Sequence, residues 1–150
     1  MIKTSILVYI TLASVMLYIC TQDNGAAGKE PEKPLSTTHY MAIDRKDTAR
    51  MELNQFSKKV EGKLIITYHK KANNRGEIKG KFKGDTLFVN YVFKVGKNKP
   101  TYKNPLAFLR KDGKLTIGIG KMENTIGRTY FKKDIPIDFE QGRFTFIPVP

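Results

Sequence analysis

The chain has 150 residues, which is enough for one domain with a modest core and hardly enough for two. Lysine and arginine outnumber aspartate and glutamate by 27 to 14, and the formal net charge of +13 favours polyanionic partners such as nucleic acid, acidic lipid or anionic polysaccharide. The single cysteine, Cys20, excludes an intrachain disulfide framework and an all-cysteine metal site.

The first residues of the chain have the pattern of an export signal. Lys3 supplies one positive charge, and the stretch SILVYITLASVMLYIC then runs to Cys20 without a charge. This apolar run is shorter than the roughly 20 residues that a transmembrane helix needs. We therefore predict a signal peptide at residues 1–19, whose removal takes Lys3 away and leaves a net charge of +12.

The end of this signal resembles that of a bacterial lipoprotein precursor. Leu17 matches the leucine that is usual three residues before the lipidated cysteine, whereas Ile19 stands where signal peptidase usually finds a small residue. The resemblance implies that Cys20 is diacylated and becomes the mature N-terminus, which would hold the chain durably to a membrane. The alternative is an uncleaved N-terminal anchor with an incidental cysteine. In either case we expect the protein in the cell envelope.

Residues 20–38 are polar, small and proline-bearing, which predicts a flexible tether. From residue 39 onward nearly every segment alternates with period two, and none has a convincing helical period. The predicted strands are 39–43, 49–56, 59–68, 76–82, 86–95, 101–111, 114–122, 128–133, 135–139 and 143–149. This spacing predicts one all-β domain at residues 39–150, an antiparallel up-and-down meander that forms a small barrel or barrel-like sandwich.

Glycine, asparagine and aspartate mark the turns between these strands. Gly84 and the pair Asp112-Gly113 predict tight hairpin turns, because glycine adopts a positive φ at little cost. Gly76 is predicted at a turn, and Gly80 inside a strand where its face meets the core. Pro105 makes its strand an edge or bulged one, since proline lacks an N–H.

The same glycines do not form a phosphate-binding loop. Such a loop needs four residues between its first glycine and Gly-Lys, followed by Ser or Thr at the start of a helix. Here three residues separate Gly76 from Gly80-Lys81, Phe82 follows, and no helix is predicted.

Alternation also identifies the side chains that point into the barrel. If the barrel were hollow they would line a cavity for a small apolar ligand, as in lipocalin-like folds, but we favour a filled core. The candidates for the barrel interior are Leu64, Ile66, Ile78, Phe82, Tyr91, Phe93, Ile117 and Ile119.

Three lysines alternate with these inward positions along one strand. Lys79, Lys81 and Lys83 fall on the face opposite Phe82, so we expect the aromatic side chains to be buried and the basic face to lack a platform on which bases could stack. The export signal also places the protein outside the cytoplasm, where nucleic acid is not the usual partner. We therefore expect no nucleic-acid binding.

Catalytic and metal-binding patterns are weak in this sequence. His39 and His69 are the only histidines, and neither lies in a zinc-binding arrangement. No nucleophile elbow of the type Gly-x-Ser-x-Gly occurs. We expect no enzymatic activity, no metal and no cofactor.

Residues 39 to 123 contain a series of spaced motifs. A strand with Gly62 and Leu64 precedes a G-x-I-x-G-x-x-x-G-D-T-L hairpin, an aromatic strand, a strand with a Phe-Leu pair and a Gly-rich strand. The corresponding positions are Gly62, Leu64, Gly76, Ile78, Gly80, Gly84, Asp85, Thr86, Leu87, Tyr91, Phe93, Phe108, Leu109, Gly118 and Gly120. These motifs resemble the small lipoproteins that are abundant in Bacteroidota. The basic residues after Tyr68 depart from the acidic pair common there, and the segment 94–100 lacks the usual acidic-serine stretch.

The resemblance implies membrane anchorage and a β domain, and it implies no reaction, because the family is largely without assigned function. We expect a lipid-anchored envelope protein with a non-enzymatic binding or structural role, attached to the membrane through lipid on Cys20. A lipocalin-like carrier of a small apolar ligand, or a basic surface that binds envelope polyanions, are the alternatives. Which side of the membrane the domain faces stays open.

Overall fold

The structure, a computed structural model, describes residues 32–97 and 100–150. The chain divides into Met1–Glu32 and Lys33–Pro150, and the second unit contains the described fold. The predicted signal peptide and its residues Leu17, Ile19 and Cys20 lie outside the described residues.

The described residues contain ten strands and no helix, which confirms the predicted all-β class. The first strand starts at Ser36, within the segment that the sequence assigns to the tether. The strands are β1 (Ser36–Asp44), β2 (Asp47–Gln55), β3 (Val60–Thr67), β4 (Asn74–Lys83), β5 (Thr86–Val95), β6 (Tyr102–Lys111), β7 (Lys114–Ile117), β8 (Met122–Thr125), β9 (Arg128–Phe131) and β10 (Thr145–Val149).

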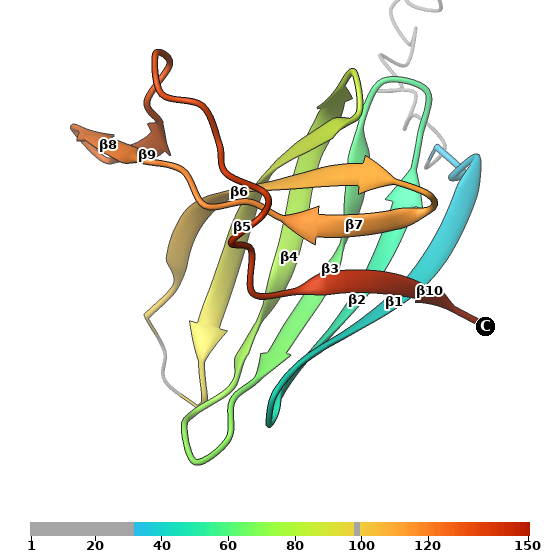
Figure 1. The fold of residues 1–150 in the computed structure, drawn as a ribbon, viewed down its shortest axis with the longest axis horizontal. Coiled ribbons are helices and arrows are strands. Elements are labelled where there is room, and N and C mark those ends of the chain that lie inside the picture. The colour runs from blue at the N-terminus through green and yellow to red at the C-terminus, as the bar shows by residue number, and fades with distance from the viewer. Residues whose placement is uncertain (1–31, 98–99) are drawn as a thin grey trace, which may run out of the picture. The chain divides into compact units, whose positions relative to one another are not determined.

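Eight of these strands close into an antiparallel barrel in the order β1-β10-β7-β6-β5-β4-β3-β2 (Figure 1). The strands β1 to β7 follow one another up and down, as predicted, and β10 closes the barrel between β7 and β1. The hairpin β8-β9 is a separate two-stranded sheet on the connection from β7 to β10. Because every barrel strand finds both neighbours within Lys33–Pro150, this segment contains its whole core and we expect it to fold on its own.

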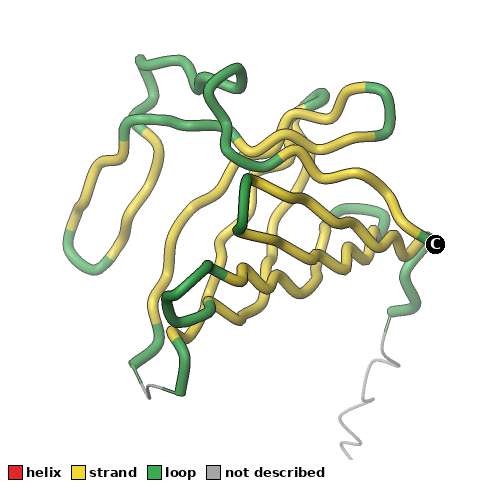
Figure 2. Tube along the Cα trace, turned by 60° about the horizontal axis from the view of Figure 1, so that its bottom comes forward, coloured by secondary structure: helices red, strands yellow, loops and turns green. Residues whose placement is uncertain are grey.

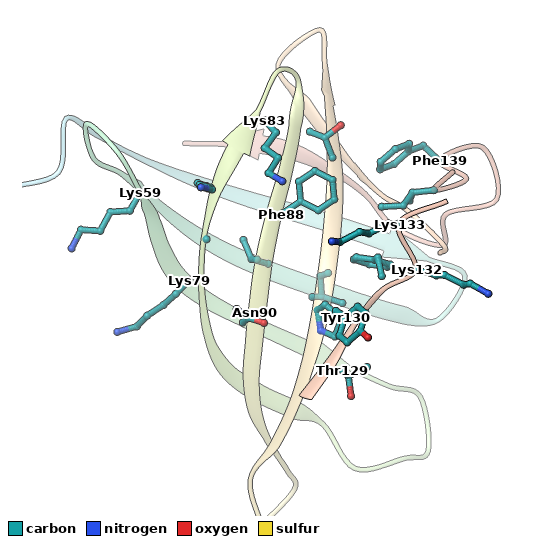
Figure 3. A pocket seen from close by; sticks show the side chains of 18 of the residues that line it. Lys59, Lys79, Lys83, Phe88, Asn90, Thr129, Tyr130, Lys132, Lys133 and Phe139 are labelled. Atoms are coloured by element: carbon teal, nitrogen blue, oxygen red, sulfur yellow. The ribbon is translucent and has the colours of Figure 1, made fainter. Parts of the chain in front are cut away.

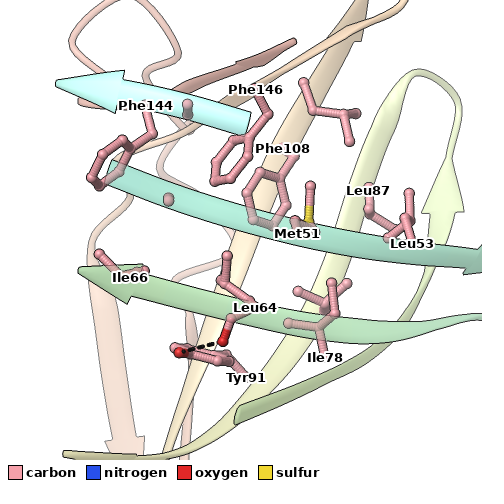
Figure 4. Packing of buried hydrophobic residues seen from close by; sticks show 14 of the residues in the cluster. Met51, Leu53, Leu64, Ile66, Ile78, Leu87, Tyr91, Phe108, Phe144 and Phe146 are labelled. Carbon is pink, nitrogen blue, oxygen red and sulfur yellow. Dashed lines mark hydrogen bonds between the residues drawn. The ribbon is translucent and has the colours of Figure 1, made fainter. Parts of the chain in front are cut away.

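The barrel interior is filled by the apolar side chains that alternate along each strand (Figure 4). Seven of the eight candidates belong to this core. Leu64, Ile66, Ile78, Tyr91 and Phe93 are buried, and Phe82 and Ile117 are partly buried against them. Further buried core side chains that were not among the candidates include Val60, Leu87, Phe108, Leu115, Phe144 and Phe146.

One buried polar contact crosses this interior. The Tyr91 hydroxyl on β5 donates a hydrogen bond of 3.0 Å to the Leu64 carbonyl on β3, two strands away (Figure 4). Burial raises the pKa of Tyr91 well above its ordinary value. The bond satisfies a hydroxyl that would otherwise be buried without a partner, and it fixes the Tyr91 ring, which stacks on Phe93 at 4.6 Å between centroids.

The prediction for Ile119 was wrong. Its side chain is 52% exposed, because β7 ends at Ile117 and the chain leaves the barrel there. Ile119 instead forms an isolated bridge with Asp138. The strand predicted at residues 135–139 was also wrong, since this bridge is its only β pairing.

Gly76 was wrongly predicted at a turn. It lies inside β4, between Leu64 on β3 and Phe93 on β5. A Cβ on Gly76 would overlap the Val92 carbonyl, and one on Gly80 would overlap the Phe88 carbonyl. Both glycines therefore allow β5 to approach β4 closely, which a small, strongly coiled barrel requires.

The predicted hairpin turns are confirmed. Gly84, Asp112 and Gly113 all adopt positive φ, at 58°, 52° and 73°. Pro105 lies in β6 where only β5 pairs with it, because β7 pairs with β6 from Phe108 onward. On the side of β6 away from β5, no strand pairs with Pro105, so the missing N–H of the proline costs no ladder hydrogen bond there.

Ion pairs link the segment before β10 to the β1–β2 turn. Arg143, just before β10, donates hydrogen bonds of 2.7 Å to both Asp44 and Asp47, which flank the β1–β2 turn. The backbone N–H of His69 also donates to Asp47, and this bond and Arg143 together lower the pKa of that carboxyl. These contacts lie where β10 meets β1 and closes the barrel.

Candidate ligand-binding groove

A second apolar layer lies outside the barrel. The chain between β7 and β10, residues 118–143, crosses the outer face of β6, and we call it the cover segment. The Gly118 N–H donates to the Ala107 carbonyl at 2.8 Å. Although Ala107 and Pro105 are outside the core cluster, both are buried. The cover segment therefore protects part of the outer face of the barrel from water.

The cover segment packs through aromatic and branched side chains. Phe131 meets Phe88 of β5 edge-on, with 6.4 Å between ring centroids. A Cβ added at Gly118 would meet the side chains of Ile137 and Phe139. These two side chains therefore pack against the backbone of Gly118, where the cover segment begins. Aromatic pairs in this geometry contribute about 0.5–1.5 kcal/mol beyond the area that they bury.

A groove of about 890 Å³ opens between the outer face of β4–β6 and the cover segment (Figure 3). This volume is within the range of about 300–1,000 Å³ that is usual for small-molecule sites. Its apolar lining comes from both sides and consists of Phe88, Val89, Pro105, Leu106, Tyr130, Phe131, Ile135, Ile137 and Phe139.

The polar side of the groove is dominated by lysine. Seven lysines line it, namely Lys58, Lys59, Lys79, Lys81, Lys83, Lys132 and Lys133. No carboxylate is among the described residues that line it. Lys59 forms an ion pair of 3.2 Å with Glu61. The other six have no ion pair with any residue in the ranges 32–97 and 100–150.

The lysines are arranged around the aromatic floor. Lys83 Nζ lies 5.6 Å from the centre of the Phe88 ring, within the range of a cation–π contact. In Figure 3 Lys133 extends toward the same ring from the cover segment, while Lys59 and Lys79 point away from it. Lys79, Lys81 and Lys83 are two residues apart along β4, so their Cα atoms are spaced by about 6.6 Å. An anion in the groove would meet positive charge from both walls.

The expectation that the basic face lacks an aromatic platform was wrong. Lys81 on β4 pairs in register with Phe88 on β5, so both side chains project from the outer face. The inward placement of Leu87 and Val89 already implied this, because Phe88 lies between them and must face the opposite way. We compared the lysines only with the inward Phe82 and did not consider the outward Phe88, so the groove was not predicted.

No pattern in the sequence predicted that the cover segment forms one wall of the groove. Residues 128–133 alternate like any other strand, and Tyr130, Phe131, Lys132 and Lys133 gave no reason to place them against β5. The contact depends on the path of the chain after Ile117, and period-two patterning carries no information about that path.

The lining also limits the chemistry that the groove can perform. Its described side chains include no histidine, cysteine, aspartate or glutamate. In residues 32–97 and 100–150 no cluster of three or more such side chains could hold a metal ion. The described lining residues therefore offer cationic and apolar contacts to a ligand.

A second, smaller depression lies on the outer face of β1–β3. It has a volume of about 360 Å³ and is lined by residues that include His39, Arg50, Glu52 and Lys63. Positive and negative side chains are mixed there, so it favours no single class of ligand. Like the groove, it lies outside the filled interior of the barrel.

No family model, no curated protein and no solved structure matches this chain significantly. Across the part of the chain that the structure describes, no helix is long and apolar enough to cross a bilayer. The function therefore has to be inferred from the groove and from the sequence.

Proposed function

We propose that this chain is a lipid-anchored binding protein of the cell envelope, and that its groove binds an anion that carries an apolar or aromatic group. The observation that carries the proposal is the lining, which combines seven lysines with an aromatic floor and has no carboxylate among its described residues. Lysine amino groups attract the anion, and the apolar floor holds the attached group.

The chemistry of the lining supports binding rather than catalysis. The described lining residues can hold a ligand through charge and apolar contact, and they include no histidine, cysteine or carboxylate that could act as a catalytic base or thiol nucleophile. The filled interior also favours the outer groove over a lipocalin-like site, because a ligand inside the barrel would have to displace buried side chains such as Leu64, Ile78 and Phe108.

Anchorage is supported by the apolar run that stops at Cys20 and by the tether after it. A Cys20→Ser variant tests it. We expect the wild type to incorporate labelled palmitate and to be processed to the size of a chain that starts at Cys20, and the variant to do neither. A wild type that takes up no label and stays in the membrane fraction at unprocessed size would instead support the uncleaved anchor.

Binding in the groove can be tested with two fluorescent probes that share the same rings. Anilinonaphthalene sulfonate carries an anion, and N-phenyl-1-naphthylamine is neutral. With the folded segment 33–150, we expect the sulfonate to bind at least about tenfold more tightly, since the lysines contribute roughly 1.4 kcal/mol or more to the anion. Equal binding of the two probes would remove the basis for an anion site.

Charge variants locate the effect. Replacing Lys79, Lys81 and Lys83 on β4 with glutamine should weaken the sulfonate about tenfold and leave the neutral probe unchanged. The matched control replaces Lys94, Lys103 and Lys114 with glutamine. These lysines lie outside the groove, and their replacement lowers the net charge by the same amount. If both triple variants weaken the sulfonate equally, the attraction comes from net charge and the groove is not the site.

A linear polyanion of the envelope is the second candidate ligand. The observation that favours it is the row of three lysines along β4, together with Lys59 and Lys79 pointing away from the aromatic floor (Figure 3). A polymer that contacts this row would release several counterions, so its affinity should fall steeply with added salt. Binding that does not change with salt would exclude this candidate.

A further inference from the structure

The β8-β9 hairpin ends in an apolar side chain that has no role in the fold. Ile126 and Gly127 form the turn between Thr125 and Arg128. Ile126 is fully exposed, with a relative exposure of 102%, and every residue of β8 is exposed. A turn of this kind is usually built from Gly, Asn, Asp, Ser or Pro, and an isoleucine there gains nothing from burial.

The hairpin projects clear of the barrel in both views (Figures 1 and 2). Its base is held in place, because Phe131 packs on Phe88 and the Lys132 N–H donates to the Lys121 carbonyl at 2.8 Å. Cross-strand hydrogen bonds hold its arms, including one of 2.8 Å between the hydroxyls of Thr125 and Tyr130. The hairpin thus presents Ile126 on a structured support.

Basic side chains lie along the hairpin between this apolar end and its base. Lys121, Arg128, Lys132 and Lys133 lie within residues 121–133, where Glu123 is the single acidic residue, and the net charge of this stretch is +3. None of the four forms an ion pair with another described residue. From the tip toward the base, the hairpin thus offers Ile126, then Arg128, then Tyr130 opposite Glu123, and then three lysines.

We propose that this hairpin inserts Ile126 into the interface of an anionic bilayer. The order of side chains fits the layers of a membrane surface, with the apolar tip nearest the acyl chains, Arg128 and Tyr130 at the interface and the lysines at the phosphate groups. A specific protein partner would require roughly 800 Å² of contact, which one isoleucine with Met122 and Tyr130 does not offer. Charge complementarity therefore assigns the hairpin to a lipid surface.

The inference does not depend on the ligand of the groove, and the test needs no lipid on Cys20. The chain has no tryptophan, so Ile126→Trp introduces a single reporter into the segment 33–150. We expect its emission to shift to the blue with vesicles of phosphatidylcholine and phosphatidylglycerol, and to shift little with phosphatidylcholine alone. The matched control is Ile43→Trp, at an isoleucine of β1 that is 64% exposed, which should not shift.

A second measurement does not use a reporter. In co-sedimentation with the same anionic vesicles, Ile126→Ser should weaken binding about tenfold or more, while Ile43→Ser should leave it unchanged. The triple glutamine variant of Lys79, Lys81 and Lys83 should keep the tryptophan shift at position 126. No shift at 126, equal shifts at 126 and 43, or loss of the shift in the β4 variant would each overturn the inference.

Discussion

The two faces of β4 and β5 use the same kinds of side chain for different purposes. On the inner face, Ile78, Leu87 and Tyr91 are buried in a closed core. On the outer face, Phe88 is only partly covered, and it lies among lysines and the cover segment. Apolar side chains that are fully covered stabilise the fold, whereas apolar side chains that a cationic groove leaves partly open remain available to a ligand.

The largest expected effect contrasts one phenylalanine from each face. Phe108 is fully buried and meets Phe146 edge-on at 5.6 Å, so Phe108→Ala should lower the free energy of unfolding by about 3–5 kcal/mol. Phe88→Ala should cost about 1–2 kcal/mol, because the groove already exposes part of its ring. Urea unfolding of both variants measures the difference, and equal losses would mean that the outer layer is a second core.

A glycine of β4 tests how closely the strands approach. Gly80→Ala should lower the free energy of unfolding by about 1–3 kcal/mol, since its Cβ would overlap the Phe88 carbonyl and force β5 away. Because Phe88 would move, binding of the sulfonate probe should weaken as well. Gly84→Ala is the control: it meets no atom, its positive φ costs about 1 kcal/mol, and it should leave binding unchanged. Thermal unfolding and probe titration together decide the outcome.

The polar contact inside the barrel should have a smaller effect. Tyr91→Phe removes the hydroxyl that bonds the Leu64 carbonyl, and we expect a loss of about 1 kcal/mol in urea unfolding. Tyr130→Phe removes a hydroxyl from an exposed pair and should cost less. A larger loss at Tyr130 than at Tyr91 would reverse the assigned roles of the inner and outer faces.

The smallest effect concerns the seam between β10 and β1. The backbone of His69 and Arg143 lower the pKa of Asp47 in the folded state, so the carboxylate stabilises the fold above its unfolded pKa of about 3.9. This stabilisation is complete at neutral pH and is lost as the pH falls from about 4 through the folded pKa. The difference in unfolding free energy between wild type and Asp47→Asn should therefore shrink in acid. A difference that is constant or grows in acid would show that Asp47 is not held in this way.

Much of the barrel could be predicted from the sequence, because the strands and turns that form it are encoded by residues close together in the chain. Alternation placed Leu64, Ile78 and Tyr91 inside, and Gly84 and Gly113 marked turns whose positive φ only a few residues tolerate. Period two also held for β2, although its composition allowed a short helix. These features depend on neighbours within a few residues, and the antiparallel meander follows from them. Closure does not, because the sequence left a barrel and a sandwich open and the pairing of β1 with β10 joins residues about a hundred positions apart.

The groove could be predicted only in part. The outward position of Phe88 beside Lys81 follows from alternation and could have been found. The path of the cover segment could not be predicted, since Ile119 continues the alternation of β7 but lies outside the barrel. Within β4, the role of Gly76 was also hidden, because it looks like a turn residue but allows a close approach of β5. Long-range contacts such as that between Phe131 and Phe88 decide these positions, and no local pattern encodes them.

The most direct test of the central claim is to map where an anionic probe binds. The backbone amide signals of the segment 33–150 would be followed by two-dimensional NMR during titration with anilinonaphthalene sulfonate. We predict shifts confined to β4, β5, β6 and residues 58–59 and 129–139, with Phe88 and Phe131 among the largest. Shifts centred on Leu64 and Ile78 in the barrel interior, or spread equally over lysines on all faces, would contradict the assignment of the groove as the binding site.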